Sequence, residues 1–317
     1  MIQLVFALGT LPILAAGDKE AAKPVFTVPF ALFRAGADLA IPYEKGWSRS
    51  CTLPLKDRLG VPEGVAAFEH RGWKVAPGLV RDVVAATKAL PRRVARLFEK
   101  HVCAVVFVSG LGSTAQIRMI GEDPPRRHGI LLIGDRIDST ANAWFTEKER
   151  SPFRSEPGFE IQATMADAAN DTRQRLIEYV FTHELAHVLE YRRPAPRIPR
   201  EFADLDRALP AEFADERGWY FPTMTGAEPL DVELAYTLYS VTVSKGLPSP
   251  YAFVSEHEDF AESFALYVHS VVLGRPWRIE LCRDQTTFLV LDDCWSTKRC
   301  EIRRKMIERF LRDETAN

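Results

Sequence analysis

The chain lacks several patterns that mark common classes of protein. Its five cysteines form no Cys-x-x-Cys pair, so a thiolate-bound zinc is not expected. No run of basic residues interleaved with aromatic residues occurs, and the net charge of −2 argues against nucleic acid as the main partner. No internal repeat is present either, so an array of stacked units is not expected. At 317 residues, the chain is long enough for one large domain or two small ones with an ample core.

Long apolar runs are also missing, apart from one stretch at residues 2–16 that is too short to span a membrane comfortably. Small residues at 15–17 follow the pattern of a cleavage site, so residues 1–17 are expected to be a signal peptide. The protein is then expected to be exported, either to a periplasm or outside the cell. No lysine or arginine precedes the stretch, although an export signal normally carries one. The alternative is a cytoplasmic protein with a buried N-terminal strand or a misassigned start.

The most informative motif is His183-Glu184-Leu185-Ala186-His187, which lies in a segment with helical periodicity. Histidines four positions apart project from the same helical face, so their ring nitrogens can bind a single ion. Glu184 then points to the space in front of that ion, where a bound water would sit. This is the His-Glu-x-x-His pattern of zinc-dependent hydrolases, and chance would produce it in roughly one chain in a hundred of this composition. The alternative is a pair of histidines on a helix surface.

The context of the motif favours a buried helix. Asp171 is the expected N-cap, and the helix is expected to end before Pro194. Apolar residues at helical spacing surround the two histidines: Leu176, Ile177, Val180, Phe181 and Val188.

A catalytic zinc needs three protein ligands and one open position, so a third ligand is expected downstream. Residues 256–271 predict a second helix whose polar face carries Glu258 and Glu262 beside an apolar stripe. Two acids on such a helix are costly unless something cationic lies opposite them. One carboxylate would bind the ion, and the other would accept a hydrogen bond from a ligand histidine. Glu256 and His257 compete as ligands, and so does Glu262.

The two segments together resemble the gluzincins, a family of zinc peptidases, and locally the catalytic domain of the anthrax lethal factor type. The likeness lies in Tyr251-Ala252, in residues 258–264 and in His269-Ser270. It covers at most residues 171–271, the separation between the two motifs is longer here, and nothing in residues 18–100 takes part.

The resemblance implies that Glu258 is the third ligand, Glu262 the carboxylate behind a ligand histidine, and Tyr251 a phenol directed at the reacting carbonyl. If Glu258 is the ligand, its carboxylate should lie within roughly 3 to 4 Å of the histidine nitrogens, given bond lengths near 2 Å. Tyr251 has the alternative role of a packing residue beside Pro250.

The expected function is a single-zinc peptidase that acts on a peptide or protein substrate, with the ion held by His183, His187 and Glu258. Glu184 would be the general base, and Tyr251 would stabilise the oxyanion by roughly 3 kcal/mol. The alternative is a zinc-stabilised binding protein or degenerate peptidase, although a purely structural site would not need Glu184. The oligomeric state cannot be determined from the sequence.

A nucleotide-binding protein is a weaker alternative. Gly110 and Gly112 follow an apolar segment at 102–108, with Asp135 and Asp138 further on, as in a dinucleotide-binding fingerprint. The segment between them should then be a crossover helix. Its composition, which includes Ile117, Ile120, Pro124 and Pro125, suits a hairpin or loop instead.

Helices and strands mix along the chain without regular βαβ alternation, which is typical of the α+β class. Strands are expected at 102–108, 129–133 and 159–164, and helices at 78–101 with a break at Pro91, over most of 210–245, and at 297–312. The resemblance implies a zincin-like fold, with a short mixed sheet beside the metal-bearing helix and a mostly helical C-terminal half. The edge strand that would pair with an extended substrate is expected at 159–164 or 129–133.

The expected domains are an N-terminal region, 18–100, and a zincin-like metallopeptidase domain, 101–317. Whether the first is separate or part of the zincin fold stays open. Cys294 and Cys300 flank a turn-like segment and could form a disulfide, with Cys282 as a rival partner. Cys103 lies in a predicted strand and is expected to be a buried thiol.

Overall fold

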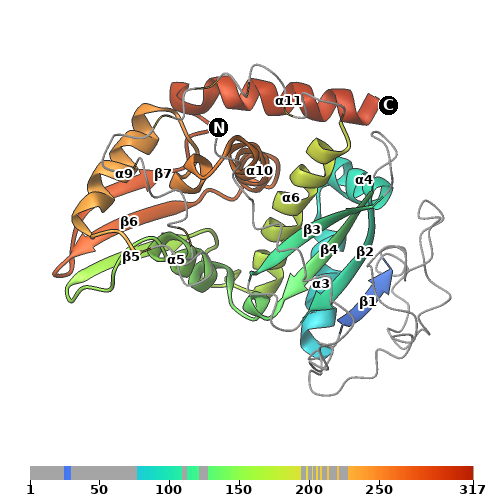
Figure 1. Cartoon of the computed structure of the whole chain (residues 1–317), viewed down its shortest axis with the longest axis horizontal. Coiled ribbons are helices and arrows are strands. Elements are labelled where there is room, and N and C mark those ends of the chain that lie inside the picture. Colours follow the sequence, from blue (N-terminus) through green and yellow to red (C-terminus); the bar gives the residue numbers. More distant parts are fainter. Residues whose placement is uncertain are drawn as a thin grey trace, which may run out of the picture.

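The computed structural model (Figure 1) describes residues 25–29, 77–108, 113–120, 128–193 and 228–316, with single positions 198, 202, 205, 208, 213 and 220 between the last two ranges. The expected signal peptide and most of the N-terminal region lie outside these ranges. So do Gly110 and Gly112 of the fingerprint-like segment.

Two sheets are present in this part of the chain. The first has the order β1-β2-β4-β3, in which β2 and β4 are parallel and the two outer strands are antiparallel to their neighbours. Its strands are β1 (Val25–Pro29), β2 (Val102–Val108), β3 (Ala115–Ile120) and β4 (His128–Gly134). The second sheet is antiparallel and consists of β5 (Phe159–Thr164), β6 (Arg278–Arg283) and β7 (Thr286–Asp292). The combination of helices with one mixed and one antiparallel sheet confirms the α+β class.

Helices make up most of the remaining described structure. They are α3 (Pro77–Ala89), α4 (Arg92–His101), α5 (Ala141–Arg150), α6 (Arg173–Tyr191), α9 (Glu233–Ser244), α10 (Glu256–Tyr267) and α11 (Glu301–Ala316). The break predicted at Pro91 separates α3 from α4, because proline lacks the N–H that a continuous helix needs. The last turn of α10 continues as a π-helix, Val268–Val272. None of the described helices is both long and apolar enough to cross a bilayer.

Strand β4 lies in the interior of its sheet, which corrects one of the two edge-strand predictions. Residues 129–133 pair with β2 on one side and with β3 on the other, so they cannot accept a further strand. The edge strand that packs against α6 is β3, which the sequence did not identify as an edge. Because β3 is a strand antiparallel to β4, the crossover helix of a dinucleotide-binding unit is absent between β2 and β4 in the described part of the segment, as predicted.

Helix α6 lies between the first sheet and α10 (Figure 1). Its N-cap is Thr172, whose hydroxyl accepts from the backbone N–H of Arg175, and not Asp171 as predicted. Asp171 instead accepts from the backbone N–H of Asn142 at 2.8 Å and so ties the start of α6 to α5. On the sheet side, a side chain at Gly129 would place its Cβ 2.3 Å from a Val188 methyl carbon, so glycine permits the close packing.

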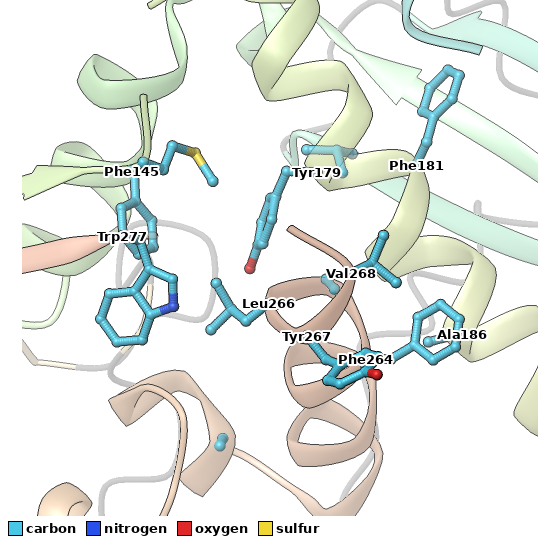
Figure 2. Packing of buried hydrophobic residues seen from close by; sticks show 14 of the residues in the cluster. Phe145, Tyr179, Phe181, Ala186, Phe264, Leu266, Tyr267, Val268 and Trp277 are labelled. Atoms are coloured by element: carbon cyan, nitrogen blue, oxygen red, sulfur yellow. The ribbon is translucent and has the colours of Figure 1, made fainter. Parts of the chain in front are cut away.

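The core on the other side of α6 is aromatic (Figure 2). Phe145 and Trp277 meet edge to face, with ring centroids 6.1 Å apart, and Tyr179 extends from α6 toward α10 beside them. Phe264 of α10 is fully buried in this core, whereas Phe181 lies on the opposite face of α6 and stacks on Phe98 of α4, with ring centroids 5.2 Å apart. This packing fixes α6 against α10 and thereby sets the positions of the side chains on their facing surfaces.

Near the C-terminus, Cys294 and Cys300 form a disulfide, and Cys282 is a buried free thiol. The side chain of Cys103 lies outside the described residues. His269, in the π-helical turn that follows α10, has its Nε2 2.8 Å from the carbonyl oxygen of Met165. Burial lowers the pKa of His269 to about 4, so this imidazole is neutral at pH 7 and its Nε2–H donates to that carbonyl.

A buried ion pair attaches α11 to α10. The Arg303 guanidinium donates to both carboxylate oxygens of Asp259, at 3.1 and 2.9 Å, and to the carbonyl of Gly246 at 2.7 Å. We expect Arg303→Met to lower the free energy of unfolding by about 3 to 5 kcal/mol, because it removes the cation that balances the charge of the buried Asp259 carboxylate. Urea denaturation of the purified variant would measure this. Lys305→Met, on the exposed face of the same helix, is the control and should change little.

Candidate metal centre

Three side chains from two helices converge between α6 and α10. The Oε2 atom of Glu258 lies 3.1 Å from Nε2 of His183 and 3.5 Å from Nε2 of His187. The two imidazole rings are 5.0 Å apart between centroids and nearly perpendicular. A possible ligand atom from each of the three residues lies within 4.8 Å of the others. The two distances from the Glu258 carboxylate to the imidazole nitrogens, 3.1 and 3.5 Å, match the roughly 3 to 4 Å expected between atoms that bind one zinc ion.

The positions of the side chains distinguish Glu258 from the other candidate ligands. Glu262 lies behind His183, with its Oε2 3.4 Å from Nδ1 of that ring, on the side away from Glu258. His257 contacts Glu190 through its Nδ1. Glu256 is exposed and faces His257. Among the described residues, Glu258 is therefore the acid that faces both histidines of the motif.

Glu190 is a carboxylate at the centre that the sequence analysis missed. It follows His187 by three positions on α6, is fully buried, and has its Oε2 3.8 Å from Nδ1 of His187. Its other oxygen contacts His257. Each motif histidine thus has a carboxylate on the Nδ1 side of its ring, at 3.4 Å for His183 and 3.8 Å for His187. In metal sites, a carboxylate that accepts a hydrogen bond at this position fixes the orientation of the ring. The only sequence signal for Glu190 was its spacing of three from His187.

The electrostatics of the centre favour positive charge between the two rings. Burial lowers the pKa of each imidazole, but hydrogen bonding to Glu258 and Glu262 at His183, and the charge of Glu258 at His187, outweigh this and raise both pKa values. Burial raises the pKa of Glu258, yet the facing histidines hold it well below its usual range. Either protons or a divalent cation can supply the positive charge that these groups favour.

Glu184 lies beside this centre and lines the adjacent hollow. Its side chain is buried, and burial is the main reason that its pKa is raised above the ordinary value for a glutamate. Glu258 raises that pKa further, whereas the two histidines lower it. A carboxylate with a raised pKa in a confined site is suited to accept and return a proton.

Tyr251 lies in a short 3-10 turn, Pro250–Phe253, directly before α10. Its ring is 6.1 Å from that of His183 between centroids and packs edge to face against Tyr220 at 4.8 Å. Burial and the carboxylates of Glu258 and Glu262 raise the pKa of Tyr251 well above its ordinary value, so the phenol stays protonated and able to donate. The two roles weighed for Tyr251 are compatible, because the packed ring also lines the hollow.

The hollow in front of His183 has a volume of about 610 Å³ including its open mouth. Its lining comes from the segment that leads into β3, from the 3-10 turn at 135–137, from α5, α6 and α10, and from the turn at 250–253: Ser113, Thr114, Ala115, Arg136, Trp144, Lys148, Tyr179, Val180, His183, Glu184, Tyr251 and Glu262. Trp144 donates through Nε1 to the hydroxyl of Thr114 at 2.8 Å and so joins α5 to β3. No sequence motif pointed to the contribution of α5.

Comparisons of the chain with models of protein families, with curated proteins and with solved structures found no match.

Proposed function

We propose that the protein is a single-zinc peptidase of the gluzincin type with a zincin-like fold. The observation that supports this most directly is the approach of Glu258 to the Nε2 atoms of both motif histidines, at 3.1 and 3.5 Å. Two imidazoles and one carboxylate are a usual ligand set of catalytic zinc, and the buried Glu184 lies next to them. His183, His187 and Glu258 would hold the ion. When bound, zinc would polarise a carbonyl and lower the pKa of a coordinated water to roughly 7.

The remaining chemistry belongs to side chains of the chain itself. Glu184 would accept a proton from the attacking water and return it to the departing amine. Tyr251, which stays protonated, would donate a hydrogen bond to the carbonyl oxygen as it gains negative charge. The hollow beside both groups would hold a substrate side chain next to the scissile bond.

Strand β3 is well placed to bind an extended peptide. It is the outer strand of its sheet, packs against α6, and begins at residues that line the hollow. An extended segment that pairs with its outer edge would run past the metal centre. This role replaces the one expected for 129–133. The other candidate, β5 at 159–164, is an outer strand as expected, but it belongs to the second sheet.

The test combines metal analysis with a peptide-library digest. The purified protein should hold one zinc per chain and cleave library peptides, and a chelator should abolish cleavage until zinc is restored. One bound zinc without chelator-sensitive cleavage would support the alternative of a zinc-stabilised binding protein. Absence of stoichiometric metal after incubation with zinc would overturn the proposal.

A further inference from the structure

Lys148 of α5 is a buried lysine beside the candidate metal centre. Its side chain is 3% exposed, and its ammonium lies 4.6 Å from the ring centroid of Tyr251. The rings of Phe145, Tyr179 and Trp144 surround it at 5.5 to 5.9 Å. Burial of a lysine is costly unless its positive charge is paired with negative groups. The groups that contact Lys148 therefore indicate the role of this side chain.

The partners of Lys148 are two buried carboxylates. Its Nζ lies 2.5 Å from Oε1 of Glu262 and 3.8 Å from Oε1 of Glu149. Glu149 accepts hydrogen bonds on its other oxygen from the hydroxyls of Tyr239, at 2.8 Å, and Tyr220, at 3.2 Å. The ammonium is therefore held in one place by charge on two sides and by aromatic rings around it.

Glu262 collects its hydrogen-bond donors from several elements. Lys148 and the hydroxyl of Ser249, at 2.7 Å, both donate to Oε1, and the hydroxyl of Tyr179 donates to Oε2 at 2.5 Å. With Oε1 fixed by two donors, Oε2 is directed to the Nδ1 side of His183, 3.4 Å away. A series of contacts thus runs from Lys148 through Glu262 to a candidate metal ligand.

We propose that Lys148 is a positioning residue for the metal centre: it holds the Glu262 carboxylate in the orientation that fixes the His183 ring, with Nε2 directed at the ion. This inference rests on the proposed zinc site. Glu262 behind the histidine was implied by the family resemblance, whereas the role of Lys148 follows from the contacts of α5. Carboxylates behind ligand histidines contribute to metal affinity by fixing the ring and its tautomer, and Lys148 acts one contact further out.

The test is zinc affinity, measured by competition with a chromogenic chelator, for Lys148→Met in the full chain. Methionine keeps much of the volume of lysine and removes the charge and the donor. We expect affinity to fall roughly 10- to 100-fold, the range typical when the support of a ligand histidine is lost. The visible absorption of the Co²⁺-loaded protein should also shift, because it reports ligand geometry rather than global stability. Lys305→Met, at an exposed pair on α11, should leave both readouts unchanged.

A double-mutant cycle separates positioning from a general effect on the fold. If Lys148 acts through Glu262, then Lys148→Met should cost little further zinc affinity in a Glu262→Gln background. Losses that simply add would overturn the proposal, and so would a Lys148→Met variant with the affinity and cobalt spectrum of the parent.

If Lys148→Met does not fold, a second variant tests whether the donors to Glu262 position the metal centre. Tyr179→Phe keeps the ring and removes one donor to Glu262, so we expect a smaller loss of affinity and a cobalt spectrum shifted in the same way. Parent-like values for this variant would overturn the proposal. Failure of the parent to bind stoichiometric zinc would instead overturn the proposed function itself, so the two failures are distinguishable.

Discussion

Replacement of Glu184 by glutamine should remove nearly all peptidase activity and leave zinc binding intact. Glutamine has almost the same shape but cannot accept a proton from water at neutral pH. General base catalysis typically contributes about 100- to 10,000-fold, so we expect kcat to fall by at least that range. Because Glu184 is not among the three converging ligand atoms, the zinc content of the variant should equal that of the parent.

The measurement is cleavage of a library-derived peptide by parent and variant, both checked for one zinc per chain. Glu301→Gln, on the surface of α11, controls for the loss of one carboxylate elsewhere. Parent-like turnover by Glu184→Gln would contradict the assignment of the general base. A variant that also lost its zinc would show that Glu184 supports the site itself.

The second large effect is expected for Glu258→Gln, which replaces the acid that faces both histidines by a neutral amide. Zinc affinity should fall more than the roughly 10- to 100-fold loss typical of an outer partner, because a direct ligand and its charge are removed. Activity should fall with it at low zinc concentration. Competition with a chelator, followed by titration of zinc back into the variant, would measure the change.

Glu256→Gln is the matched control, since Glu256 lies two positions earlier on α10, is exposed, and was a rival for the third ligand. Its zinc affinity should equal that of the parent. If Glu258→Gln kept the parent affinity while His257→Gln or Glu262→Gln lost it, the third ligand would be one of those rivals.

Local patterns in the sequence predicted the two helices that carry the candidate site. Helical spacing around His183 and His187, and the acids at 258 and 262, depend on the period of a single helix, so they can be read without knowledge of the fold. The strand at 159–164 was also predicted with its observed bounds, because its residues alternate between buried and exposed faces. The N-cap at Thr172 was missed because the neighbouring Asp171 is an equally good capping residue by type.

Contributions from packing between distant segments could not be predicted in this way. Lys148 and Trp144 reach the centre because α5 packs beside α6, and no period or motif in 141–150 encodes that contact. Strand order is a second example. The composition of residues 129–133 suits an edge strand. These residues are nevertheless paired on both sides, because β3 lies next to β4 on the side away from β2, and that placement cannot be predicted from 129–133 alone. The spacing of apolar residues indicates whether a segment is a helix or a strand, whereas the elements that pack beside it are determined by the topology of the fold.

The separation of the three converging residues along the chain has a consequence for how the protein would acquire its ion. His183 and Glu258 are 75 positions apart, and only the docking of α6 on α10 brings them together. An unfolded chain could offer the two histidines alone, which would bind zinc weakly and in a flexible segment. Tight capture would therefore come late in folding, and the captured ion would hold the two helices together, adding about 4 kcal/mol at a thousandfold excess over its dissociation constant.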